Sequence, residues 1–100
     1  MRPMQVVFRQ QAIDDLAAIA AYISRESPAG ADKVIQKIHR TIFKTLANFP
    51  SGGRLDRATG AREFPVAGLP YLVIFLASED LLYIVAVFHT SREPASKPRP

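Results

Sequence analysis

The sequence predicts a small α+β domain, with a two-helix hairpin packed on one face of a small, mainly antiparallel four-stranded sheet in the order β-α-α-β-β-β. Two stretches in the first half place apolar residues at the three-and-four spacing of a helix face. Three short runs in the second half are rich in β-branched and aromatic residues, which is typical of strands. The chain has 100 residues, 48% hydrophobic and 22% charged, which indicates one globular domain.

The first strand and the first helix are predicted from residues 4 to 25. Met4–Phe8 is a short apolar run that suits a strand. In the stretch that follows, Ile13, Leu16 and Ile23 fall on one face of a helix, which we expect to end near Arg25. This face is expected to pack on the sheet.

The second helix is predicted to begin at Ser27-Pro28, because serine can cap a helix and proline fits its first position. It is expected to run to about Phe49 and to stop at Pro50–Gly53. At about 100° per residue, four cations fall within roughly 60° of one another, opposite an apolar arc that faces the core. The cations are Lys33, Lys37, Arg40 and Lys44, and the arc is Ile35, Ile38, Ile42, Leu46 and Phe49.

This positive stripe indicates an anionic partner. Residues 33–62 hold seven of the 13 lysines and arginines and only one acid, Asp56, in a chain of net charge +4. Like charges at helical spacing repel one another by about 0.2–0.5 kcal/mol per pair, so amphipathicity alone does not explain the stripe. Concentrated positive charge favours polyanions or acidic protein partners. A plain solvated helix face is the alternative, and it stays open.

The second half predicts the rest of the sheet. A polar connection, residues 54–61, leads to strands at Arg62–Val66, Tyr71–Ala77 and Leu81–His89, and Ser78-Glu79-Asp80 is short enough to join the last two as a hairpin. Both hairpin strands are apolar on both faces, whereas the two helices can cover only one. We therefore expect an uncovered sheet face that receives a partner. Alternatively, both strands are central and curl around a tight core.

Composition excludes several classes of function. The chain has no cysteine, which excludes disulfides, thiol catalysis and cysteine-built zinc sites, and its two histidines lie far apart in sequence. No cofactor or metal is expected. The start lacks the apolar stretch of a secretory signal, and no run approaches the ~18 residues of a membrane span, so a cytoplasmic protein without membrane contact is expected. One domain is predicted at residues 1–92, followed by a proline-rich tail at 93–100.

The order and spacing of residues along nearly the whole chain resemble one known family. The matching residues are Val7-Phe8, Ala12, Asp15-Leu16, Ile19, Tyr22-Ile23, Ser27-Pro28, Ala31, Ile38, Ile42, Leu46, Pro50, Gly53-Arg54, Arg62-Glu63, Val66, Pro70-Tyr71, Val85-Ala86-Val87, His89 and Arg92. Together they resemble the RelE/ParE superfamily of bacterial toxins. The resemblance implies a toxin neutralised in a hetero-oligomer by a cognate antitoxin, which we expect to cover the exposed sheet face.

The superfamily has two branches with different targets. RelE-like members cut messenger RNA on the ribosome, using basic residues on the sheet with a tyrosine or a His-Tyr pair near the C-terminus, whereas ParE-like members inhibit DNA gyrase. Here His89 is followed by Thr90, and the strand from Tyr71 opens without a cation. Because the set of proton-transfer groups looks incomplete, the ParE-like branch is favoured, with inhibition of gyrase and arrest of replication.

Two alternatives remain open. One is a ribosome-dependent mRNA endonuclease that uses Arg54, Arg62 and His89, and the other is a non-toxic binding module with the same fold. The residues expected to contact target or antitoxin are Lys33, Lys37, Arg40, Lys44, Arg54, Arg62, Tyr71, His89 and Arg92. All of these except Arg92 also have a structural alternative, such as a surface ion pair of Arg62 with Glu63 or a backbone hydrogen bond that ends the strand at His89.

Overall fold

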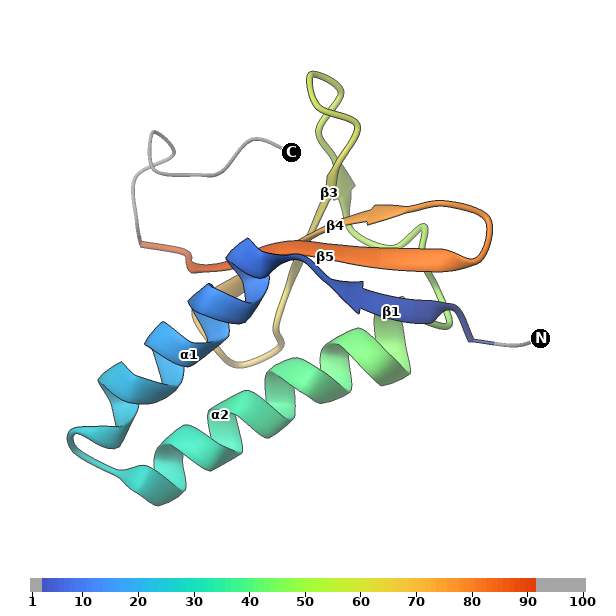
Figure 1. The fold of residues 1–100 in the computed structure, drawn as a ribbon. Coiled ribbons are helices and arrows are strands. Elements are labelled where there is room, and N and C mark those ends of the chain that lie inside the picture. The colour runs from blue at the N-terminus through green and yellow to red at the C-terminus, as the bar shows by residue number, and fades with distance from the viewer. Residues whose placement is uncertain (1–2, 92–100) are drawn as a thin grey trace.

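Five strands form a single sheet in the order β1-β5-β4-β3-β2, and the two helices lie on one of its faces (Figure 1). The computed structural model describes residues 3–91. The elements are β1 (Gln5–Phe8), α1 (Gln10–Ser24), α2 (Pro28–Arg40), η1 (Thr41–Leu46), β2 (Arg54–Leu55), β3 (Arg62–Pro65), β4 (Tyr71–Ala77) and β5 (Leu81–His89). The predicted α+β class is confirmed, with one strand more than expected.

The additional strand, β2, lies within the connection that was expected to be irregular. Its two residues pair with β3, Arg54 opposite Glu63 and Leu55 opposite Arg62. Gly53 precedes it at φ 85°, and a Cβ there would lie 2.5 Å from the carbonyl oxygen of Glu63. Only glycine therefore allows the chain to come this close to β3.

The sheet is mixed because β1 runs parallel to β5, whereas all other neighbours are antiparallel. The hairpin strands β4 and β5 occupy the centre and have the predicted bounds. Their register shifts between Ile74 and Phe75, since Ile74 lies opposite Ala86 and Phe75 opposite Ile84. Val85 is thus the extra residue of a bulge, which bends this part of β5.

The start of α2 is as predicted, but its end is not α-helical. The Ser27 hydroxyl accepts the N–H of Gly30 at 2.9 Å, and Pro28 takes the first helical position. From Thr41 the helix widens into the π-helix η1, where the N–H of Ala47 bonds the carbonyl of Ile42, five residues back. This wider turn lets Ile42, Leu46 and Ala47 all be buried.

The main core lies between the helices and the sheet. It joins side chains of α1, α2 and η1 to those on the covered face of the sheet, and its largest fully buried members are Phe75, Ile38, Ile42, Leu46, Leu82 and Ile84. Phe75 stands at the centre of the sheet on β4 and has no exposed area. The apolar arc predicted for the second helix thus supplies much of this core. Its last member, Phe49, was wrongly assigned to the core, because it lies beyond η1 and is 67% exposed.

The opposite face of the sheet corrects the expectation of a bare surface. Ile74, Val85 and Ala86 are 1%, 4% and 0% exposed and form a second cluster with Ala61, which precedes β3. Leu76 and Phe88 pack against this cluster and are only partly exposed. The centre of the face is therefore buried among Ala61, Leu76 and Phe88, which agrees with the alternative interpretation of two central strands around a tight core.

The carboxylate of Asp15 connects α1 to the edge of β5 that β1 leaves unpaired. Oδ2 of Asp15 accepts the backbone N–H of Val87 at 2.9 Å, and its Oδ1 accepts the side-chain amide of Gln11 at 2.7 Å. Because β1 pairs with β5 only as far as Ile84, Val87 has no strand neighbour on that side. Asp15 supplies the acceptor that a further strand would have provided.

Asp15→Ala is expected to lower the free energy of unfolding by about 1–3 kcal/mol, because it leaves a partly buried N–H without an acceptor. Asp15→Asn keeps a carbonyl oxygen at the same place and should lose less. Asp14→Ala is the matched control, since Asp14 is exposed and the one hydrogen bond of its carboxylate among residues 3–91 is to the Gln10 side chain. Urea denaturation of the three variants measures the effect. Equal losses for Asp14→Ala and Asp15→Ala would contradict the assigned role.

Candidate functional site

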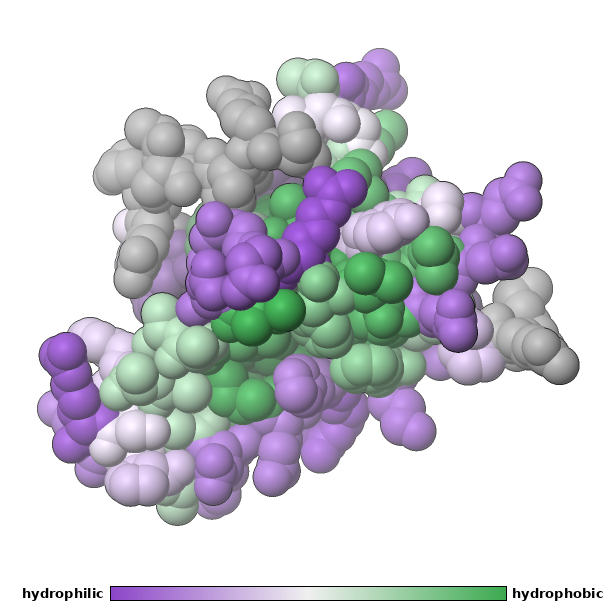
Figure 2. Space-filling model, in the orientation of Figure 1, coloured by the Kyte–Doolittle hydropathy of each residue, from purple (hydrophilic) through white to green (hydrophobic). Residues whose placement is uncertain are grey.

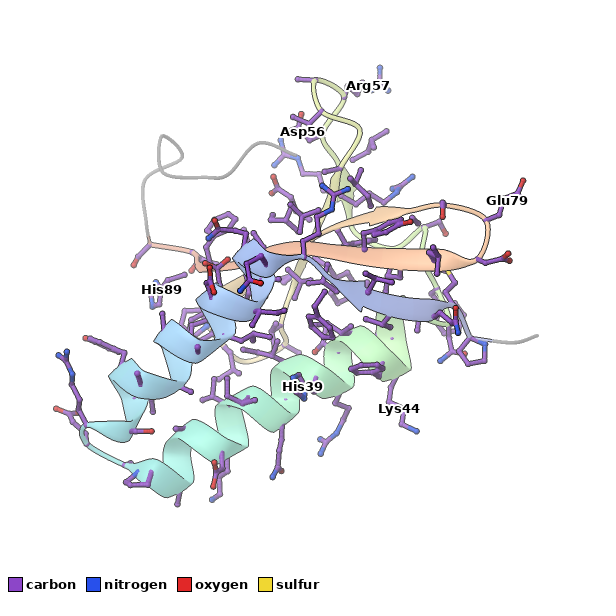
Figure 3. The ribbon with its side chains drawn as sticks, in the orientation of Figure 1. His39, Lys44, Asp56, Arg57, Glu79 and His89 are labelled. Carbon is purple, nitrogen blue, oxygen red and sulfur yellow. The ribbon has the colours of Figure 1, made fainter. Side chains whose placement is uncertain are left out.

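Tyr71 and His89 form an aromatic pair where β4 begins and β5 ends. They are direct neighbours in the strand register, and their rings meet edge to face with centroids 5.3 Å apart. Tyr71 is only 7% exposed, so its ring belongs to the core. Figure 3 shows His89 at the end of the sheet nearest α1.

The bonding of His89 limits its proton chemistry. Its Nδ1 accepts the backbone N–H of Ser91 at 3.1 Å and lies 2.6 Å from the Ser91 hydroxyl. Since an amide N–H can only donate, Nδ1 carries no proton, and the proton of the neutral ring is on Nε2. A general base needs a free lone pair facing the substrate. Nε2 is then a donor, so in this arrangement His89 donates a hydrogen bond instead of accepting a proton.

Arg54 and Arg62 are on neighbouring strands but on opposite faces of the sheet. Residues that pair across strands share a face, so Arg54 is on the side of Glu63, and Arg62 is on the helix side with Phe75. Nη1 of Arg62 lies 3.5 Å from the carbonyl oxygen of Gly53. The two guanidinium groups therefore leave the sheet in opposite directions.

A polar hollow lies beside Arg54. It has a volume of about 370 Å³ and is lined by Arg54, Leu55, Asp56, Arg57 and Glu63. The Asp56 carboxylate accepts the N–H of Ala58 at 3.0 Å and so closes the turn of the β2–β3 loop. Figure 3 shows Asp56 and Arg57 in this protruding loop, well away from His89. Sequence reasoning did not select Arg57, which no local motif distinguishes from other surface arginines.

The structure does not gather Arg54, Arg62 and His89 around one point. His89 pairs with Tyr71 at one edge of β4. Arg62 pairs with Phe75, four residues further along, at the opposite edge of the same strand. Strand geometry then puts the Cα atoms of His89 and Arg62 roughly 16 Å apart. Val73 stands between them on that face of β4, and Arg54 is on the opposite face. The three residues do not form a common pocket.

The four cations of the second helix lie together as predicted. Lys33, Lys37 and Arg40 are on α2 and Lys44 is on η1, and all four side chains are exposed. We call these four residues the basic stripe. Figure 3 shows Lys44 pointing away from the sheet. Arg92, also a predicted contact residue, lies outside the described residues.

A second surface was not predicted. Phe8, His39 and Phe43 form a triangle of rings with centroids 6.0–6.1 Å apart. Beside it, Phe8, Ile13, Leu16 and His39 line an apolar pocket of about 240 Å³. We call Phe8, Ile13, Leu16, His39 and Phe43 the apolar helix surface. Figure 2 shows apolar side chains gathered in a band over α1, α2 and β1.

Two members of the apolar helix surface are strongly exposed. Ile13 is 48% and Phe43 45% exposed. The sequence placed Ile13 on the core face of the first helix, and this was wrong, because Ala12 takes the buried position. An exposed pair of large apolar side chains beside an apolar pocket is typical of an interaction site.

The described part of the chain shows neither a metal site nor a membrane span. Within residues 3–91 no three His, Asp or Glu side chains are grouped so that they could hold a metal ion. No helix in the same range is long and apolar enough to cross a bilayer.

Comparison with known proteins gives consistent matches. Residues 6–94 match the family model described as ParE toxin of type II toxin-antitoxin system, parDE. "Toxin RelE2" of Caulobacter vibrioides is 36% identical over 88 residues, covering 88% of this chain and 97% of the relative. "Putative toxin Y4kP" of Sinorhizobium fredii is 32% identical over 83 residues, covering 83% and 84%.

The fold also matches a solved structure. A chain from the structure titled "Chromosomal ParDE TA system from P. aeruginosa" superposes with a TM-score of 0.76 at 23% sequence identity. The match covers 88% of this chain and 97% of the other.

Proposed function

The chain belongs to the ParE toxin family of type II toxin–antitoxin systems, and on this premise we propose that it arrests growth by binding DNA gyrase rather than by cutting RNA. Its partners are then gyrase as target and a cognate antitoxin that neutralises it in a hetero-oligomer. Because gyrase acts on the chromosome, the proposed site of action is the bacterial cytoplasm. No cofactor or metal takes part in this proposal.

We favour gyrase over RNA as the target because Arg54, Arg62 and His89 are separated in the fold. Cleavage of RNA through its own 2′-hydroxyl needs a base, an acid and cations around one phosphate. Here the arginines leave opposite faces of the sheet, and the Nδ1 atom of His89 is occupied by Ser91. An inhibitor that binds its target by surface complementarity needs no such cluster.

A ribosome-dependent endonuclease remains the second candidate. The pair of Tyr71 and His89 favours it, because the Nε2–H of His89 can donate a hydrogen bond to a phosphate. This candidate requires Arg54 or Arg62 to reach the same phosphate, which the strand register does not support.

The antitoxin is proposed to bind the apolar helix surface. The centre of the open sheet face, where we first expected it, is buried within the chain. In contrast, Ile13 and Phe43 are about half exposed and flank a pocket large enough for an apolar side chain. Arg9, Arg40 and Lys44 adjoin Phe8, His39 and Phe43 in sequence. A partner helix with apolar anchors and flanking carboxylates matches this combination.

Synthesis rates in cells that express the toxin without its antitoxin test the proposed target. Incorporation of labelled thymidine is expected to fall before incorporation of labelled methionine, because loss of gyrase activity stops replication first. Co-expression of the antitoxin is the control and should restore both rates. An early fall in methionine incorporation alone would favour the endonuclease, and undisturbed growth would favour a non-toxic binding module.

A further inference from the structure

The basic stripe is a second interaction surface, which adjoins the apolar helix surface at Arg40 and Lys44 and extends beyond it to Lys33 and Lys37. Lys33, Lys37, Arg40 and Lys44 are exposed, and none of them forms an ion pair within residues 3–91. Asp32 is the single acid among the residues of α2 and η1. The charge of the stripe is thus not neutralised by its own helix.

The spacing of the stripe fits a phosphate backbone. The cations are four, three and four residues apart, so at 1.5 Å per residue the stripe is about 16 Å long. The phosphates of one strand wind around the duplex axis, so a straight stripe does not follow a single strand. The stripe is longer than the width of either groove of a duplex, about 6 Å for the minor and about 12 Å for the major groove, and can therefore cross a groove and contact the phosphates of both strands.

The composition of the stripe favours a nucleic acid over a protein. Protein interfaces are depleted of lysine and carry aromatic and other large apolar residues at their centre. On this chain those residues are in the apolar helix surface, whereas Gln36, between Lys33 and Lys37, is polar and exposed. Lysine and arginine are side chains that contact phosphates in nucleic-acid complexes.

We propose that the basic stripe binds the phosphodiester backbone of a double-stranded nucleic acid without reading its sequence. Contacts of lysine and arginine to phosphates are electrostatic and carry no direct sequence information. The inference goes beyond the proposed function, because gyrase inhibition requires no nucleic-acid contact by the toxin. A toxin that holds DNA in this way gains a second attachment when it binds an enzyme that carries DNA.

Salt-dependent binding to a 20-base-pair duplex of DNA, and to the matching RNA duplex, tests the inference with purified toxin and fluorescence anisotropy. Four phosphate contacts predict a slope of about −3.6 for log K against log salt, which is about a 150-fold loss of affinity between 50 and 200 mM. Lys37→Gln with Arg40→Gln should reduce the slope to about −1.8 and this loss to about 12-fold.

Arg9→Gln with Arg25→Gln is the matched control. It removes the same charge from the two ends of α1, where Arg9 lies over Tyr83 and Arg25 over Tyr22, and it should keep the slope of the unmodified toxin. The inference is supported if either duplex binds with a slope that falls in Lys37→Gln with Arg40→Gln and is kept in the control. Comparison of the affinities for the two duplexes identifies the nucleic acid. No binding at 50 mM salt, or equal slopes for the two double variants, would overturn it. The assay contains no gyrase, so its failure leaves the proposed target untouched.

Discussion

Toxin carrying both Ile13→Asp and Phe43→Asp is expected to bind its antitoxin at least about 10³-fold more weakly than the unmodified toxin. Each apolar anchor at the centre of an interface contributes about 2 kcal/mol or more, and two of them correspond to this factor. The replacements also put carboxylates opposite the acidic groups that we expect on the antitoxin. Because both side chains are about half exposed, the fold should tolerate them. Isothermal titration calorimetry measures the affinity.

Tyr22→Asp is the matched control for this prediction. Tyr22 is a large apolar residue on α1 and is 71% exposed, but it is not part of the pocket. This variant should bind the antitoxin within a few-fold of the unmodified toxin. In cells, the antitoxin should rescue growth from Tyr22→Asp but not from the double variant. Unchanged affinity of the double variant would show that the antitoxin binds elsewhere.

Phe75→Ala is expected to lower the free energy of unfolding by about 3–5 kcal/mol. Phe75 has no exposed area and stands on the central strand β4, where the helices and the sheet meet. Its truncation removes a whole ring from the main core and leaves a cavity. Small domains are stable by only about 5–15 kcal/mol, so this loss brings the chain close to unfolding.

Phe49→Ala tests whether the loss depends on burial. Phe49 is 67% exposed, and its truncation should change stability by less than about 1 kcal/mol. Guanidinium denaturation followed by circular dichroism measures both variants. Similar losses for Phe49→Ala and Phe75→Ala would contradict the assignment of the core.

The regular elements could be predicted because their residues determine them locally. The hairpin strands at 71–77 and 81–89 follow from two apolar runs around a three-residue turn, and Ser27-Pro28 starts α2 as expected. The strand β2 was missed because two polar-flanked residues carry no strand pattern, and only the close approach of Gly53 to β3 allows it to pair. Its formation depends on a distant segment of the chain.

The surfaces were predicted less well than the elements. The basic stripe follows from helical spacing and is exposed as expected. The burial of Ile74 and Ala86 could not be predicted, because an apolar run does not reveal what packs on each face of its strand. The apolar helix surface was missed as well, since it combines residues of β1, α1, α2 and η1 that lie far apart in the sequence.

Inhibition of purified gyrase tests the proposed function most directly. Supercoiling of relaxed plasmid is measured while the toxin or its His89→Ala variant is titrated, with a translated messenger RNA on ribosomes assayed in parallel. We expect both proteins to stop supercoiling at concentrations within a few-fold of each other and to leave the RNA intact. Undiminished supercoiling, together with RNA cleavage that His89→Ala abolishes, would contradict the proposal.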